Sequence, residues 1–293
     1  MNSYSPDNDK VKTLREFLAW RPPDLINLIE DGILTPQGTM FIVGPSKSWK
    51  SMLSNHLGFC LAQGIPWLGL QTTKCSVLII QIEIVEAAYH KRIVKYTNYI
   101  DNPPNNICFK TETQLKIDTG VGLSRLDKII QQAKNNLDPT LPLVVIIDPL
   151  YRCLSSNVSD AQDASRAQDN LIQMSSKHSC AIVLVHHTRL TQVCDSGPVN
   201  LGAEELMGSS YWNNWCDSML MVRRLDPEVE TLVGINFEYT RHAEHRPPRW
   251  KIRWQRKDLR PKILETVIYS DDEEEDEIEI TTRDLLGDSN EHI

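Results

Sequence analysis

Apolar runs alternate with amphipathic segments along the first two thirds of the chain. The uninterrupted apolar runs predict buried strands at 39–43, 76–83, 143–148 and 180–187, with a shorter strand at 107–110. The segments between them carry apolar residues at helical spacing and predict helices at 52–64, 85–100, 121–136 and 159–178. Strands that are apolar throughout and alternate with helices are typical of a largely parallel sheet covered on both faces.

The pattern changes after residue 188. Segment 189–206 has little periodicity and several Gly, Pro and Asn residues, so we expect a mobile loop there. The stretches at 218–225, 231–241 and 249–257 look like antiparallel strands that finish the sheet. The sequence therefore predicts an α/β fold with a mostly parallel central sheet, helices on both faces and antiparallel C-terminal strands.

The net charge of −8 comes from the end of the chain. Residues 270–293 hold eleven Asp and Glu against Arg283 alone, whereas the rest of the chain holds 30 Lys and Arg against 28 Asp and Glu. We therefore expect an N-terminal extension at 1–24, one globular domain at 25–269 and an acidic tail at 270–293. Like charges repel, so the tail is expected to be disordered. The alternative is a tail that binds a protein partner or competes with nucleic acid for basic surface.

Two further features of the composition bear on the compartment. The polar start does not resemble a signal peptide, and no apolar run reaches the roughly 18–20 residues that a membrane span requires. The seven cysteines are scattered, mostly inside apolar runs, and none has metal-ligand spacing. We expect small core residues in a reducing compartment, hence a cytoplasmic protein that does not enter a membrane.

The stretch GPSKSWKS, at residues 44–51, follows the first strand and opens the first helix. It fits the phosphate-binding loop G-x-x-x-x-G-K-[ST] except at Trp49, where the motif has its second glycine. In such a loop the backbone N–H groups surround the phosphates, Lys50 neutralises them and Ser51 holds Mg²⁺. Tryptophan fits only if its ring points away from the phosphates, and a chance basic turn is the alternative. The candidate ATP-binding residues of the loop are Gly44, Pro45, Ser46, Lys47, Ser48, Trp49, Lys50 and Ser51.

Polar residues also stand at the ends of later strands, where open α/β sheets bind ligands. Asp148 ends the strand LVVIID, as a Mg²⁺-orienting Walker B acid does. Glu83 ends SVLIIQIE and could polarise an attacking water, although Glu86 is a nearby rival. His186 and His187 leave the strand at 180–187, and at least one is expected to face a γ-phosphate or a DNA loop. An ordinary strand-end carboxylate or a structural histidine is the alternative for each.

The ordered set GPSKSWKS, VLIIQIEIVEAAYHKR, VVIIDPL, IVLVHHTR and GSSYW resembles the RepA-type hexameric helicases and related AAA-family ATPases of the RecA superfamily. The resemblance covers roughly residues 25–255 and implies a RecA-like P-loop NTPase fold. It implies that Lys50 and Ser51 bind triphosphate and Mg²⁺ and that Asp148 is the Walker B acid. The resemblance further implies three roles around the γ-phosphate: catalytic glutamate for Glu83, γ-phosphate sensor for His187 (or His186), and nucleotide contact for Arg92.

The chain departs from this family at two positions. Ile84 follows Glu83 where the family often has an acid. Met207 precedes Gly208 where the family commonly has an arginine that reaches the neighbouring subunit's nucleotide. Arg241 is a candidate for this trans finger, with a surface arginine as the alternative. Since losing a finger can cost roughly 10³–10⁵ in hydrolysis rate, ATP binding is a firmer expectation than fast turnover.

A basic stretch at 241–262 holds nine Lys and Arg with Trp250 and Trp254 among them. Charge with interleaved aromatic rings is typical of proteins that bind single strands. The alternation also fits a half-exposed strand that buries Trp250, Ile252 and Trp254, and we favour this interpretation for the tryptophans.

Together the residues and the resemblance predict a Mg²⁺-dependent ATPase that couples ATP hydrolysis to single-stranded DNA binding or translocation, as a helicase does, in replication, recombination or repair. We expect a homo-oligomeric ring, such as a hexamer, with segment 189–206 as its central DNA loop. One alternative is a recruitment or regulatory subunit with weak or no hydrolysis. The other is a recombinase-like filament former.

Overall fold

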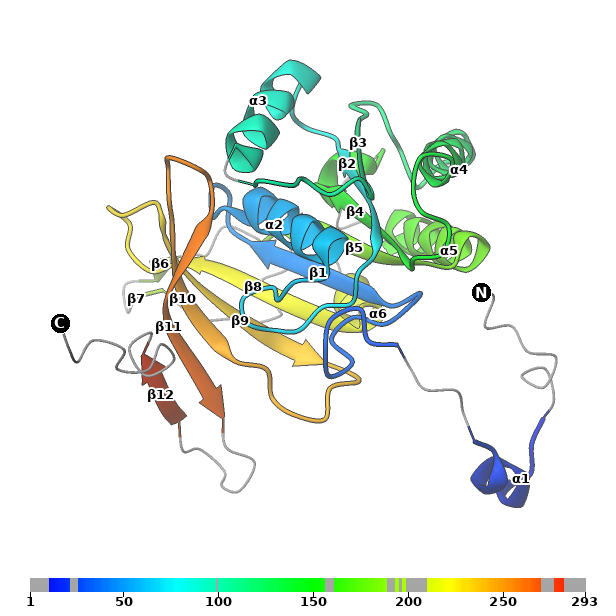
Figure 1. Ribbon diagram of the computed structural model, residues 1–293. Helices are drawn as coiled ribbons and strands as arrows, with labels where there is room; N and C mark the ends of the chain where they lie inside the picture. Colours follow the sequence, from blue (N-terminus) through cyan, green and yellow to red (C-terminus); the bar gives the residue numbers. More distant parts are fainter. Residues whose placement is uncertain are drawn as a thin grey trace.

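A ten-stranded mixed sheet forms the centre of the protein in a computed structural model (Figure 1). The strand order is β12-β11-β10-β9-β8-β1-β5-β4-β2-β3. The structure describes residues 11–21, 26–98, 100–155, 161–188, 193–194, 197–198, 210–269 and 277–281.

Six neighbouring strands make the parallel half of the sheet. They are β1 (Thr39–Gly44), β2 (Ser76–Gln81), β3 (Ile107–Thr111), β4 (Leu143–Asp148), β5 (Cys180–His187) and β8 (Ser218–Arg224). Every residue of β1, β2 and β4 is buried, which explains why their sequences are apolar without alternation. The five strands predicted in the first two thirds of the chain are confirmed.

Helices cover both faces of this half, as predicted. On one face α2 (Lys50–Gln63) and α3 (Glu86–Thr97) pack over the sheet. On the other face lie α4 (Gly120–Lys134), α5 (Ala161–His178), α6 (Ser210–Trp215) and the 3₁₀ helix η2 (Leu150–Cys153). α2 stops at Gly64, whose φ of 68° is a left-handed conformation that glycine adopts without a steric penalty.

The antiparallel half extends the sheet from β8 through β9 (Leu232–Thr240), β10 (Arg249–Trp254), β11 (Pro261–Tyr269) and β12 (Glu277–Thr281). The burial of Trp250, Ile252 and Trp254 confirms the half-exposed strand. One prediction needs correction at β8, which pairs parallel with β1 and turns antiparallel only toward β9. Continuous apolar strands look alike in either direction, so the sequence did not distinguish the two.

Part of the acidic segment pairs with the sheet. Residues 277–281 form β12 on the edge of β11. Their alternation, EIEIT, suits an edge strand whose backbone finds partners in β11. The rest of 270–293 lies outside the described residues.

The remaining described segments are short. α1 (Leu14–Ala19) is capped by Thr13 and Glu16 in a reciprocal capping box, and none of its residues is buried. Within segment 189–206 the structure describes β6 (Val193–Cys194) and β7 (Gly197–Pro198), which pair with each other; the rest of the expected DNA loop, and Met207, lie outside the described residues. Across the described parts of the chain, no helix combines the length and apolarity needed to cross a membrane.

Two glycines at the start of α4 give a stability test of this fold. A Cβ built on Gly122 would lie 1.6 Å from the Lys116 carbonyl oxygen, whereas one on Gly120 would meet nothing within 4 Å. We expect Gly122→Ala to lower the free energy of unfolding by about 3 kcal/mol, because the backbone before α4 must shift. Gly120→Ala is the matched control and should be neutral or stabilising by about 0.5–1 kcal/mol. Urea unfolding checks both, and equal effects would contradict the close approach of the backbone at residues 116 and 122.

Candidate functional site

The turn between β1 and α2 needs special backbone conformations at several positions, among them Lys47 with φ 59°. A Cβ on Gly44 would lie 2.2 Å from the carbonyl oxygen of Val222 on β8, so β1 approaches β8 too closely for a side chain. Trp49 is the N-cap of α2, with φ 69° and ψ 13°. This left-handed conformation costs a non-glycine residue about 1–2 kcal/mol. The second glycine of the motif is therefore favoured for its backbone conformation, and here tryptophan adopts that left-handed conformation.

Contacts with the antiparallel half compensate for the strain at Trp49. The indole Nε1 donates a hydrogen bond to the carbonyl oxygen of Glu230 at 2.7 Å. The ring stacks on Trp254 of β10, with centroids 5.4 Å apart and planes 7° apart. An aromatic pair and a hydrogen bond each contribute about 0.5–1.5 kcal/mol, which is similar to the conformational cost. The ring is thus held toward β10 and the β8–β9 turn.

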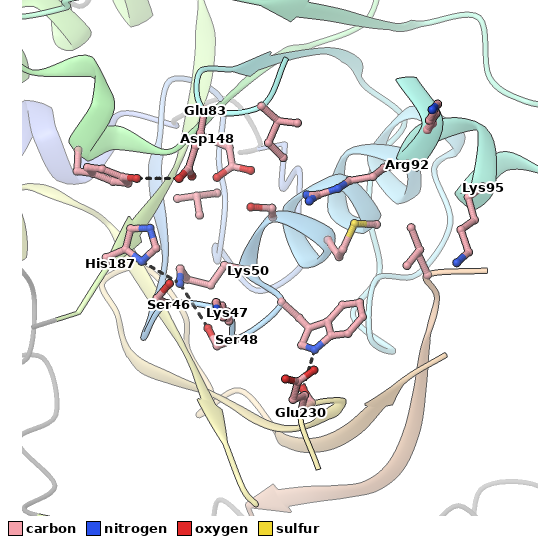
Figure 2. Close-up of a pocket in the computed structure, with 18 residues that line it drawn as sticks. Ser46, Lys47, Ser48, Lys50, Glu83, Arg92, Lys95, Asp148, His187 and Glu230 are labelled. Atoms are coloured by element: carbon pink, nitrogen blue, oxygen red, sulfur yellow. Dashed lines mark hydrogen bonds between the residues drawn. The ribbon is translucent and has the colours of Figure 1, made fainter. Parts of the chain in front are cut away.

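A cavity of about 820 Å³ opens beside this turn, at the carboxyl ends of the parallel strands (Figure 2). Glu83 comes from just after β2, Asp148 from the end of β4 and His187 from the end of β5. They share one edge because Gly44 pairs with His187, and Gln81 with Asp148. The predicted residues that line the cavity are Ser46, Lys47, Ser48, Trp49, Lys50, Ser51, Glu83, Arg92, Asp148 and His187.

Lys50 lies at the centre of the loop. Its Nζ donates to the Pro45 carbonyl oxygen at 2.6 Å and lies 3.4 Å from both Ser48 Oγ and His187 Nδ1. Burial lowers the pKa of the amine to about 8, while the charges of Asp148 and Glu83 oppose this shift. Burial, and then the charge of Lys50, lower the pKa of His187 to about 4. At neutral pH this pair therefore presents one cation and one neutral imidazole.

The two acids of the cavity differ in their surroundings. Asp148 is buried, and burial raises its pKa to about 6 against hydrogen bonds from the Ser51 hydroxyl and from Gln81. Glu83 is exposed, and its Oε1 accepts a hydrogen bond from the Tyr151 hydroxyl at 3.0 Å. The Tyr151 ring also contacts His187 edge-on, with centroids 4.9 Å apart. Asp148 thus favours contact with a cation, whereas Glu83 can reach solvent.

The oxygen atoms around Asp148 fit a Mg²⁺ ion. Mg²⁺ binds through one or two carboxylates plus phosphate oxygens and water. Here the Asp148 carboxylate and the Ser51 hydroxyl are in hydrogen-bond contact at the phosphate loop. Burial makes the carboxylate anion costly, and a cation beside it would offset that cost.

Three candidate residues lie away from the cavity. His186 is buried against Phe41 on the opposite face of β5, because successive strand residues point to opposite faces. Arg241 follows β9 at the opposite edge of the sheet, where its backbone N–H bonds Asp217 and its guanidinium bonds the Asn214 carbonyl. Glu86, the rival of Glu83, is exposed on α3 and does not line the cavity.

Other residues in or behind the cavity escaped the sequence analysis. Gln81 lies behind the cavity and donates a hydrogen bond to Asp148. The only sequence feature that marks it is a polar side chain at the end of an apolar strand. The Tyr151 hydroxyl donates a hydrogen bond to Glu83, and no sequence pattern marked this tyrosine as part of the site. Lys91 and Lys95 join Arg92 on α3, and in Figure 2 Arg92 extends toward the two acids while the Lys95 amine lies at the far rim.

Comparisons with known proteins identify the family and the fold. A family model described as an AAA domain matches residues 6–193. No curated protein matches the sequence.

Solved structures share the fold at low sequence identity. A DnaB-like replicative helicase, from a study of its interactions with primase, has a TM-score of 0.58 and 11% identity, with 78% of this chain and 57% of that chain covered. The present chain thus spans little more than half of that helicase. A KaiC-like protein from Pyrococcus horikoshii OT3 has a TM-score of 0.53 and 10% identity over 80% and 93% of the two chains. RadB recombinase has a TM-score of 0.50 and 15% identity over 77% and 90%.

The buried Asp148 should make the protein less stable than it could be. The raised pKa means that the folded state binds a proton more tightly than the unfolded chain. This group therefore favours folding at acidic pH, and that contribution is lost as pH rises through about 6. We expect Asp148→Asn to raise the free energy of unfolding at pH 7.5 by about 1–3 kcal/mol without ligand, and by less at pH 5. Urea unfolding at the two pH values measures this, and a variant that is less stable at pH 7.5 would refute the assignment.

Proposed function

The chain belongs to the AAA domain family and has the RecA-like P-loop ATPase fold, and from this premise we propose that it hydrolyses ATP to act on single-stranded DNA. The observation that carries the proposal is the convergence of Lys50, Glu83, Asp148 and His187 on one cavity beside the loop. A chance basic turn would not bring strand ends with these side chains together. ATP is the proposed nucleotide and Mg²⁺ the proposed cofactor.

The residues divide the chemistry of hydrolysis between them. The loop N–H groups and the start of α2 bind the β- and γ-phosphates, and the Lys50 ammonium offsets their charge. Ser51 and Asp148 would hold Mg²⁺, which neutralises charge on the phosphate oxygens when bound. Glu83 orients the attacking water and accepts its proton. His187, neutral because of its lowered pKa, donates a hydrogen bond to the γ-phosphate, and Arg92 adds a charge from α3.

Nucleic acid and oligomerisation belong to the same proposal. The fold shared with a DnaB-like replicative helicase and with RadB recombinase supports a role on DNA. We propose a homo-oligomeric ring such as a hexamer, a central DNA loop at 189–206, Arg241 as the finger that reaches a neighbour and a cytoplasmic location. The acidic residues after 270 would bind a protein partner.

A second function has one observation in its favour. Arg241 is tied to Asn214 at the edge of the sheet opposite the cavity, so within the described chain this finger candidate is already engaged. An ATP-binding switch with weak or no hydrolysis, which recruits or regulates other proteins, would not need a finger.

ATPase assays with and without single-stranded DNA separate the two functions. Stimulation with strand unwinding supports the motor, and tight ATP binding without turnover supports the switch. Electron microscopy with ATP and DNA distinguishes a ring from a recombinase-like filament.

Lys50 gives the direct test of the proposed site. We expect Lys50→Ala to reduce ATP hydrolysis by about 10²–10³-fold, because a charge that stabilises the transferred phosphate is lost. Lys128→Ala is the control, since Lys128 is exposed on α4, on the face of the sheet away from the loop. Unchanged hydrolysis in Lys50→Ala would sink the proposal, provided that thermal melting shows a folded variant.

A further inference from the structure

The Gln81 side chain contacts both Asp148 and the turn that carries Glu83. It is the last residue of β2 and only 1% exposed. Its Nε2 donates a hydrogen bond to Asp148 Oδ2 at 3.2 Å. Its Oε1 accepts hydrogen bonds from the backbone N–H groups of Glu83 at 2.9 Å and Ile84 at 3.4 Å. One carboxamide therefore joins the end of β4 to the turn that carries Glu83.

We propose that Gln81 is a positioning residue, which aims a hydrogen-bond donor at the Mg²⁺-binding Asp148 and fixes the backbone of the turn that presents Glu83. The inference deepens the proposed ATPase function and rests on it for the chemical roles of the two acids. Gln81 does not line the cavity itself, so it acts through Asp148 and the turn that carries Glu83.

The orientation of the amide follows from its partners. Two N–H groups converge on one end of the carboxamide, so that end must be the oxygen. The NH₂ group must then face Asp148, whose carboxylate accepts the bond. This donor favours the ionised carboxylate that a cation needs, in a buried place that otherwise disfavours the charge.

Among the residues that the structure describes, the turn after β2 has few other supports near Glu83. The Ile82 N–H bonds the Asp148 carbonyl at 2.8 Å, and the Glu83 side chain meets the Tyr151 hydroxyl. Beyond these, the Glu83 and Ile84 N–H groups depend on Gln81 Oε1. If it is removed, the turn loses two hydrogen bonds at the position where a shift of about 1 Å can cost roughly 10²-fold in rate.

Two substitutions separate the two contacts. Gln81→Glu is almost isosteric and keeps an acceptor for the turn, but it aims an oxygen at Asp148 in place of a donor. Gln81→Met removes both contacts at a similar size. Gln131→Glu, on the exposed face of α4, is the control for the added charge.

The measurements are the Mg²⁺ dependence of ATP hydrolysis, kcat at saturating Mg²⁺ and the thermal midpoint. For Gln81→Glu we expect the half-saturating Mg²⁺ concentration to rise by roughly 10–100-fold, because mutation of a residue that orients a metal ligand typically weakens metal binding by this factor. The kcat of this variant should largely recover at high Mg²⁺. For Gln81→Met we expect kcat to stay roughly 10–100-fold low even at saturating Mg²⁺.

Folded variants with wild-type Mg²⁺ dependence and kcat would overturn the inference. So would a loss of activity that only follows the thermal midpoint, since that marks a structural role alone. If the wild-type protein binds ATP but does not hydrolyse it, the ATPase proposal fails separately. The Mg²⁺ dependence of fluorescent ATP analogue binding then still tests Gln81, because the Gln81→Glu shift should persist there.

Discussion

The candidate site depends on one stacking contact, between Trp49 of the loop and Trp254 of β10. This contact and the hydrogen bond to Glu230 offset the cost of the left-handed backbone at residue 49. The contact also makes the antiparallel half of the sheet part of the site. An ion pair between Arg256 and Glu230, at 2.9 Å, joins the two hairpins at the point where the indole docks. The folded strands β8 to β11 therefore stabilise the loop.

The parallel half contributes the chemistry through its geometry. Adjacent strands end at one edge, which brings residues 44, 83, 148 and 187 together although they are far apart in the sequence. Because successive strand residues point to opposite faces, His187 faces the cavity and His186 points into the core. Burial opposes the charges of both Lys50 and Asp148. Buried charged groups of this kind are common in ligand-binding sites, where they lower the stability of the protein without its ligand.

Sequence patterns predicted the parallel sheet because fully buried strands are apolar without interruption, as β1, β2 and β4 are. The strand ends also located Glu83 and Asp148, since ligands bind at that edge. The family match and the solved structures confirm the RecA-like ATPase family and fold, whereas the roles of individual residues stay predictions.

What the sequence did not predict depends on contacts between distant residues. Trp49 and Trp254 are 205 positions apart, and nothing local marks them as a pair. Gln81 and Tyr151 act through partners on other strands, so neither stands in a motif. The direction of β8 and the pairing of β12 depend in the same way on neighbours in the sheet.

The most direct measurement is an experimental structure of the protein with Mg²⁺ and a non-hydrolysable ATP analogue. The account predicts β- and γ-phosphates on the backbone N–H groups of the loop and on Lys50 Nζ, with Mg²⁺ between Ser51 and Asp148. The Trp49 indole should remain stacked on Trp254. A nucleotide bound elsewhere, or an indole that leaves Trp254 to make room for the phosphates, would contradict it.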